Sequence, residues 1–249
     1  MKLSYSAVWA DVTALLRSHA SLIATVAGVF IFLPALLTAY FLPQPEARNL
    51  SEMGRLWTEY ASANWHWLLL SRLVSMVGEI AILLLLFSRG ISVGGAIAAA
   101  FALLLSYFAA SVLANIAIGL GVLLLIVPGL YLLGRLGPLN SVLVAEARRN
   151  PVEALRRCWA LTAGHGWAIV GLILIVAFAA AVVVAVATTL LGIVFILVAG
   201  QEIGQLLVLI VRTAGNAAMM TLLLVLSAAL YRRLAEGEAG APAAGPRAG

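Results

Sequence analysis

Long apolar stretches alternate with short polar connectors from Leu22 to Leu230. A helix needs about twenty apolar residues to cross the roughly 30 Å of hydrocarbon in a bilayer. The pattern therefore predicts an all-α, polytopic membrane helix bundle with about six transmembrane helices. The predicted spans are residues 21–42, 65–87, 96–118, 121–144, 167–193 and 204–231.

The least defined boundary separates the third and fourth predicted spans, because no charge occurs between residue 96 and Arg135. A single helix across 96–144 would overshoot the bilayer, so the chain has to turn back within it. We predict a tight turn at residues 115–121, with residues 128–129 as a kink or an alternative break. Small residues are expected to let these two spans pack closely. They are Gly119, Gly121, Gly129, Gly134 and Gly137.

Composition favours a membrane domain over a soluble one. Hydrophobic residues make up 64% of the chain and charged residues 10%, with a mean hydropathy of +1.11. Soluble domains carry about 25% charged residues. We therefore assign residues 1–235 to one membrane domain. The tail, residues 236–249, is rich in Ala, Gly and Pro and is expected to be disordered.

The distribution of lysine and arginine predicts the orientation. Eleven basic residues lie before the first span, next to the connectors that follow the second and fourth spans, or after the sixth span, and two lie on the opposite side. By the positive-inside rule, both termini and the connector at 145–166 face the cytoplasm. The eleven are Lys2, Arg17, Arg89, Arg135, Arg148, Arg149, Arg156, Arg157, Arg232, Arg233 and Arg247, and the two are Arg48 and Arg55.

The connector segment at 151–163 has the pattern of a helix lying on the membrane surface. Asn150 suits its N-cap and Pro151 its first position. Val152, Leu155 and Trp159 line one face, and Glu153, Arg156 and Arg157 line another. Two other segments repeat this pattern, the outer one more weakly. They carry Trp9, Val12 and Leu16 before the first span, and Met53, Leu56, Trp57 and Tyr60 before the second.

The formal charge of +5 lies beside apolar segments and not in a basic tract. This arrangement favours membrane lipids with anionic headgroups as the partner on the cytoplasmic side, rather than nucleic acid. A protein partner or a second copy of the chain is also compatible with it. The candidate lipid contacts are Arg148, Arg149, Arg156 and Arg157.

Two runs carry a resemblance to a known family. Residues 124–146 and 151–167 resemble the membrane domain of glycerophosphoryl diester phosphodiesterases and of related uncharacterised six-span proteins of the bacterial inner membrane. The resemblance covers about residues 120 to 170 and implies an inner-membrane location. Cys158 departs from it, since a small residue such as serine is expected there. The family-like residues are Pro128, Gly129, Tyr131, Glu146, Pro151, Ala154, Leu155, Arg156, Arg157, Trp159, Leu161, Thr162 and Gly164.

The resemblance does not imply an activity for this chain. A phosphodiesterase of that type carries its chemistry in a separate soluble α/β barrel, and no such barrel fits here. One cysteine and three scattered histidines, His19, His66 and His165, match no metal-ligand spacing. No nucleophile–base pair or phosphate-binding loop is evident either. We therefore expect a non-enzymatic protein without a cofactor or a metal.

Polar residues inside the predicted spans are the main candidates for a functional site, because burying them in hydrocarbon is costly. They are Arg72 and Glu79 in the second span and Arg212 and Asn216 in the sixth. The two arginines have a similar predicted depth from the outer face. We expect Glu79 to pair with one or both as a structural cluster. An outer-leaflet phosphate or a transported anion is the alternative counter-ion.

Three functions are compatible with these expectations. The first is a non-catalytic accessory protein that engages lipid or protein partners through its cytoplasmic surface helices. The second is a small transporter or lipid-handling protein that uses the cluster of Arg72, Glu79 and Arg212. The third is a membrane anchor for a separately encoded hydrolase.

Overall fold

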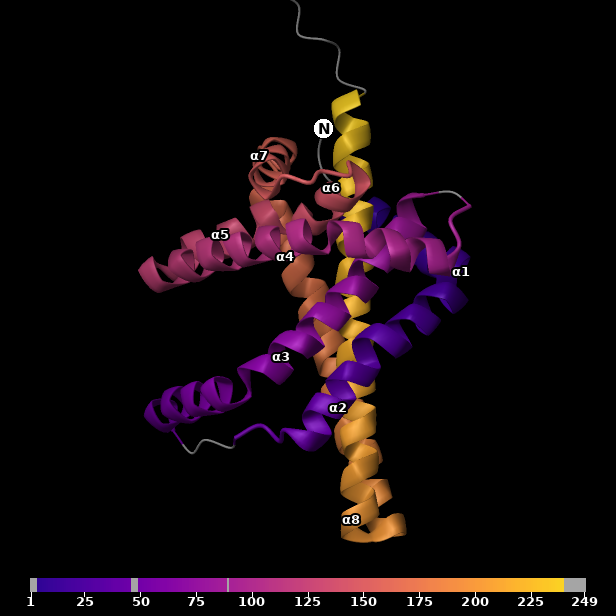
Figure 1. The fold of residues 1–249 in the computed structure, drawn as a ribbon, viewed down its shortest axis with the longest axis vertical. Coiled ribbons are helices and arrows are strands. Elements are labelled where there is room, and N and C mark those ends of the chain that lie inside the picture. The colour runs from indigo at the N-terminus through magenta and orange to yellow at the C-terminus, as the bar shows by residue number, and fades with distance from the viewer. Residues whose placement is uncertain (1–3, 46–48, 89, 240–249) are drawn as a thin grey trace, which may run out of the picture.

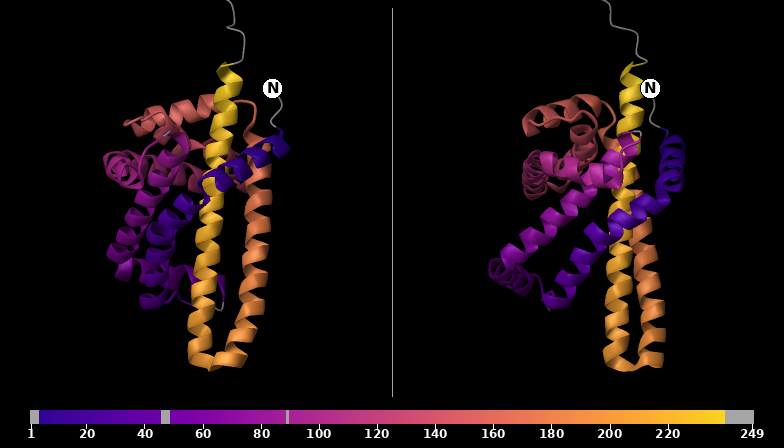
Figure 2. Two further views of the ribbon diagram at one scale, coloured as in Figure 1. Left: turned by 90° about the vertical axis from the view of Figure 1, so that its right-hand side faces the viewer. Right: turned by 45° about the vertical axis from the view of Figure 1, so that its right-hand side comes forward.

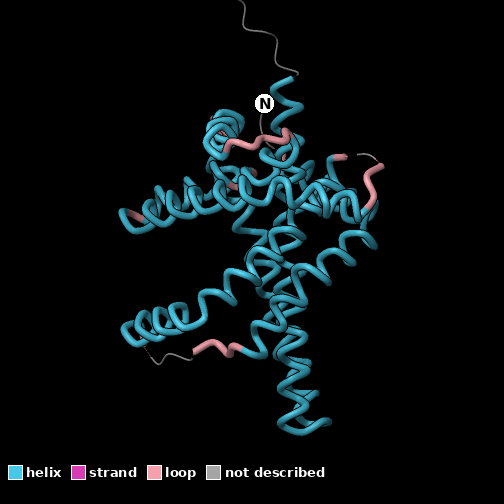
Figure 3. Tube along the Cα trace, in the orientation of Figure 1, coloured by secondary structure: helices cyan, strands magenta, loops and turns pink. Residues whose placement is uncertain are grey.

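The computed structural model describes residues 4–45, 49–88 and 90–239. Every regular element within these residues is helical (Figure 3), which confirms the predicted all-α class. The elements are α1 (Tyr5–Ala27), the π-helical turn η1 (Gly28–Phe32), α2 (Leu33–Phe41), α3 (Leu50–Phe87), α4 (Val93–Leu124), α5 (Ile126–Leu136), α6 (Leu139–Ala145), α7 (Pro151–Leu161) and α8 (Gly166–Ala239).

Four helical segments of the described chain are long and apolar enough to cross a membrane. They are Tyr5–Phe41, Glu52–Phe87, Val93–Leu124 and Gly166–Glu238. The chain therefore has the helices of a membrane protein, but the predicted count of six spans is not confirmed.

α8 is a hairpin with two long arms. The backbone leaves helical geometry at Gly200, where φ is 78° and ψ is 178°, a conformation that glycine adopts without steric cost. The chain reverses there, at the bottom of Figure 1. Its 74 residues form arms of about 55 Å each, longer than the roughly 30 Å of hydrocarbon in a bilayer. The fifth and sixth predicted spans lie on these two arms.

α1 and α2 form one bent segment that crosses the α8 hairpin obliquely (Figures 1 and 2). The backbone at His19 is not helical (φ −127°, ψ 18°), so α1 bends between the predicted surface helix and the predicted first span. Pro34 lacks an N–H and its ring excludes ordinary α-helical bonding to the preceding turn. The wider π-helical turn Gly28–Phe32 accommodates it, and the chain stays helical to Phe41.

α4 and α5 form a second hairpin, which runs across the long axis of α8 (Figure 1). α4 is continuous to Leu124, and Leu125 is extended with φ −160° and ψ 140°. The predicted turn at 115–121 is therefore wrong, and the alternative break at 128–129 is close to the true one. The ring of Pro128 would clash with the carbonyl of Leu124 in a continuous helix. The predicted span 121–144 is consequently not one helix but the end of α4, then α5 and α6.

Glycines let the arms of the α4–α5 hairpin approach each other. A Cβ atom on Gly129 would lie 2.8 Å from the Cα of Val122, and one on Gly121 would lie 2.9 Å from the Cα of Gly129. The expected close packing therefore holds for these two glycines. Gly119 faces open space, whereas Gly134 and Gly137 pack against the start of α8.

α7 is helical over most of the segment that was predicted to lie on the membrane surface. The Asn150 side chain accepts a hydrogen bond from the N–H of Val152 at 3.0 Å, and the helix begins at Pro151. Val152 and Trp159 are 46% and 44% exposed, whereas Ala154 and Cys158 are buried. One face of α7 therefore packs on the protein and another is open.

The start of α1, α7 and the last turns of α8 lie together at one end of the molecule (Figure 2). We call this the terminal end, and Gly200 marks the opposite end. Both described chain ends thus lie on one side, while their orientation in a membrane stays a prediction. α8 continues to Ala239, so it includes the first four residues of the predicted tail. The described residues do not include residues 240–249 of the predicted tail. They also do not include four basic residues used to predict the orientation, namely Lys2, Arg48, Arg89 and Arg247.

The hairpin contact predicts opposite effects for two glycine substitutions. Gly129→Ala should lower the melting temperature in detergent, because its Cβ would meet backbone atoms of Val122 that cannot rotate away. Gly119→Ala should leave stability unchanged or raise it by up to about 1 kcal/mol through helix propensity. Thermal unfolding of both variants checks this. A Gly129→Ala variant as stable as Gly119→Ala would contradict the observed packing.

Candidate functional site

Arg72 and Glu79 form an ion pair along one face of α3. They are two helical turns apart, so both side chains project on the same side. Arg72 Nη1 donates to Glu79 Oε1, and Nη2 lies 3.4 Å from Oε2. The Arg72 side chain is 45% exposed and that of Glu79 is 18% exposed. The pairing predicted between these residues is therefore present.

Tyr107 of α4 completes this cluster from the protein interior. It is fully buried, and its hydroxyl donates to Glu79 Oε2 at 2.7 Å. Asn140 of α6 also contacts Tyr107 and accepts a hydrogen bond from Ser111 at 3.4 Å. The cluster therefore joins α3, α4 and α6. The sequence analysis missed Tyr107, whose signal was a lone phenol within the Ala- and Leu-rich run of α4.

Arg212 and Asn216 do not belong to this cluster. Both are exposed on the second arm of α8, and Arg212 forms no ion pair with any described residue. The prediction of one polar cluster that includes them is not borne out by the geometry. Equal depth along two helices was the only basis for joining the arginines, and depth does not determine which way each helix face points.

Glu146 is the centre of a second network, at the terminal end. It accepts hydrogen bonds from Arg148 Nε at 2.6 Å, from Arg157 Nε at 3.0 Å and from the Tyr231 hydroxyl at 3.4 Å. Arg157 also donates to both carboxylate oxygens of Glu238, at 2.9 and 2.6 Å. The network ties α7 and the loop before it to the last turns of α8.

Electrostatics keeps Glu146 ionised. Partial burial acts to raise its pKa, but hydrogen bonds from Arg148 and Arg157 outweigh this effect and lower the pKa below its usual value. The stabilisation that Glu146 provides is therefore present at neutral pH and is lost only as the pH falls through this lowered pKa.

The four arginines predicted to contact lipid therefore divide into two pairs. Arg148 and Arg157 are occupied by Glu146 and Glu238. Arg149 and Arg156 are exposed, and neither forms an ion pair with a described residue. Of these four arginines, Arg149 and Arg156 are therefore the two without a described carboxylate partner.

Arg135, at the end of α5, is a buried cation that the sequence analysis counted only as a positive charge. It is 5% exposed. Nη1 donates to the Tyr131 hydroxyl at 3.2 Å, and Nη2 donates to the carbonyl of Trp159. Its guanidinium carbon lies 4.0 Å from the centre of the Trp159 ring. No described carboxylate pairs with it, so the ring face and the carbonyl end of α7 supply the compensating negative potential.

Other residues of the family-like segments also contact Arg135 or lie next to it, where α5 meets α7. The Thr162 hydroxyl donates to the Arg135 carbonyl at 3.0 Å. The Cys158 thiol, at the position that departs from the family, donates to the same carbonyl at 3.3 Å. Gly164 has a φ of 77° in the turn after α7. The resembling segments therefore build one corner between α5, α7 and the start of α8. Other family-like residues lie in the α4–α5 hairpin, namely Pro128 and Gly129, or in α7, namely Pro151, Ala154, Leu155 and Leu161.

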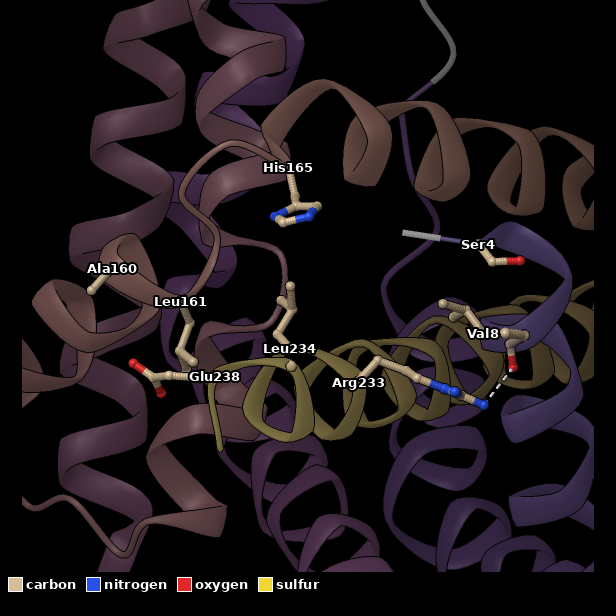
Figure 4. A pocket seen from close by; sticks show the side chains of 10 residues that line it. Ser4, Val8, Ala160, Leu161, His165, Arg233, Leu234 and Glu238 are labelled. Carbon is tan, nitrogen blue, oxygen red and sulfur yellow. Dashed lines mark hydrogen bonds between the residues drawn. The ribbon is translucent and has the colours of Figure 1, made fainter. Parts of the chain in front are cut away.

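A small cavity of about 290 Å³ lies at the terminal end, between α1, the end of α7 and the last turns of α8. Ser4, His165 and Arg233 surround it (Figure 4). Arg233 is itself engaged, because its Nη2 donates to Asp11 Oδ1 at 2.8 Å. The cavity is thus bordered by contacts that hold α1 to α8.

No family model, curated protein or solved structure matches this chain. The resemblance to the phosphodiesterase membrane domain therefore stays an expectation from its residues. Among the described residues, no group of three or more His, Cys, Asp and Glu side chains is placed to hold a metal ion.

The ion pair on α3 predicts coupling between its two members. Glu79→Gln should destabilise the protein in detergent by about 1–3 kcal/mol, because it leaves the Arg72 guanidinium and the Tyr107 hydroxyl poorly satisfied. Adding Arg72→Gln should recover part of this loss. Thermal unfolding of the single and double variants measures the coupling.

Arg212→Gln serves as the matched control. Combined with Glu79→Gln it should show additive effects, since the two side chains share no contact. Coupling of Glu79 to Arg212 as strong as its coupling to Arg72 would contradict the arrangement described above.

Proposed function

We propose that the chain is an integral membrane protein with four crossings, formed by α1–α2, α3 and the two arms of α8. The α4–α5 hairpin runs across these helices (Figure 1) and is proposed to lie in the membrane plane, near the cytoplasmic surface. Its tip carries five consecutive apolar side chains that are 59% to 81% exposed, which suits burial among lipid chains. They are Leu123, Leu124, Leu125, Ile126 and Val127.

We propose that the open face of α7 binds anionic phospholipid. The protein would then act as a non-catalytic accessory protein of the membrane. The observation that carries the proposal is the open face of α7. Val152 and Trp159 are exposed there, and the exposed Arg149 and Arg156 have no described carboxylate partner. Apolar side chains beside free arginines are typical of helices that bind an anionic bilayer surface.

The other two functions receive less support. Arg72, Glu79 and Tyr107 satisfy one another within the protein, which favours a structural role for them over a transport pathway. An anchor for a separate hydrolase, in a bacterial inner membrane, rests on the resemblance alone. Identification of a transported substrate would support the transporter function, and a co-purifying hydrolase would support the anchor function.

The proposed lipid contact predicts a headgroup-specific loss. The Arg149→Gln/Arg156→Gln variant should bind phosphatidylglycerol at least tenfold more weakly at low salt, since each arginine contributes about 1 kcal/mol. Binding of phosphatidylethanolamine should not change. Native mass spectrometry of the full chain titrated with each lipid measures both.

Arg55→Gln is the control for loss of an exposed arginine elsewhere, because Arg55 belongs to α3 and pairs with Glu59 at 3.4 Å. It should leave phosphatidylglycerol binding intact. Equal loss in both variants, or no loss in the double variant, would refute the proposed contact.

The proposed orientation predicts a labelling pattern. Cys158 is fully buried, and burial raises the pKa of its thiol to about 12, so it cannot report topology. In a Cys158→Ala background, Glu59→Cys should react with an impermeant maleimide on intact cells. Arg149→Cys should react only after permeabilisation. The reverse pattern would invert the topology.

A further inference from the structure

The two arms of α8 enclose an apolar groove near the terminal end. It has a volume of about 990 Å³ and extends from Leu172 to Thr188 on the first arm, roughly 24 Å along the helix. The second arm lines it from Val211 to Leu222. Figure 2 shows the two arms side by side from the terminal end to the turn at the opposite end.

Small residues make the groove hollow. At its floor the arms touch, because a Cβ on Gly215 would lie 2.8 Å from Val184 Cγ1. Towards the Gly200 turn the arms close, and a Cβ on Gly192 would lie 3.1 Å from Val208 Cγ2. The groove therefore ends within the hairpin. The small residues that line it are Ala179, Ala180, Ala187, Ala214, Gly215 and Ala218.

The terminal end of the groove has a different character. Tyr5, Ser6 and Trp9 of α1 lie there, and α1 passes across the arms of α8 at this level (Figure 2). Tyr5 and Trp9 are 43% and 45% exposed. Side chains of this kind, with an apolar ring and a polar group, typically lie at the level of lipid headgroups. The groove is thus polar at one end and apolar along its length, like a phospholipid molecule.

We propose that this groove holds one acyl chain of a phospholipid, with the glycerol and headgroup beside Tyr5, Ser6 and Trp9. Its length of roughly 24 Å exceeds the ~15 Å depth of one leaflet, which leaves room for a tilted chain. A crossing helix of a partner protein needs about 30 Å of length and a width of about 10 Å, whereas the arms already close at Gly192. This site deepens the proposed lipid-binding function, but it lies apart from the arginines of α7.

Photo-crosslinking tests the assignment on the full chain. The protein is reconstituted in vesicles of phosphatidylethanolamine and phosphatidylglycerol, one of which carries a diazirine on its acyl chain. Adducts mapped by mass spectrometry should concentrate on residues 172–188 and 211–222. They should form with either headgroup and persist at high salt, because an apolar chain makes the contact.

Two variants that fill the groove complete the test. Ala180→Phe should reduce groove adducts at least fivefold, and Ala218→Phe should do so from the other arm. Ala181→Phe, at an exposed neighbouring position outside the groove, should leave them unchanged. Thermal unfolding of each variant establishes that it is folded.

Adducts spread evenly over the exposed surface of α8, undiminished groove adducts in both folded filling variants, or crosslinks to another polypeptide would each overturn the proposal. Failure of the α7 contact is distinguishable, because the Arg149→Gln/Arg156→Gln variant leaves the groove intact. That variant should lose headgroup specificity while it keeps its groove adducts.

Discussion

The buried guanidinium of Arg135 joins α5 to α7 beside the start of α8. It comes from the end of α5, stacks on Trp159 of α7 and bonds to that residue's carbonyl. Its own carbonyl accepts from Thr162, close to the start of α8. A buried cation without a carboxylate requires several such partners at once. The attachment of the α4–α5 hairpin to α7 therefore depends on this contact, while Gly134 and Gly137 pack α5 directly against the start of α8.

Charged side chains at the terminal end connect helices more than they face the surroundings. Arg233 binds Asp11 and so fastens α8 to α1, while Arg232 donates to the Leu86 carbonyl at the end of α3. Glu146 forms ion pairs with both Arg148 and Arg157. Individually, partly exposed pairs of this kind contribute about 1 kcal/mol or less. Together they position α1, α3, α7 and the end of α8, and they leave few arginines free for lipid.

Sequence predicted the helices well where charges or aromatic residues bordered an apolar run. The first span, which follows Arg17, the second span, which precedes Arg89, and the capped α7 follow from such borders. The α4–α5 hairpin did not, because residues 96–134 carry no charge to mark an edge. In the candidate site, the pair of Arg72 and Glu79 was predictable from their spacing on one helix. Tyr107, Asn140 and the position of Arg212 depend on how different helices face one another, which spacing along one helix does not determine.

The sequence shows where proline and glycine interrupt a helix, but the effect of each interruption depends on tertiary contacts. Pro34 leaves its helical segment continuous, because the π-helical turn before it absorbs the missing bond. Pro128 separates α4 from α5, and Gly200 reverses α8. In an apolar medium each unsatisfied backbone group is costly, so every interruption needs a partner for the freed groups or a place where water reaches them. At Leu125 the extended residue still donates to the Gly121 carbonyl at 3.0 Å, and the close approach of Gly121 and Gly129 keeps the hairpin compact. Whether a breaker bends, separates or reverses a helix thus depends on the contacts that the neighbouring helices provide.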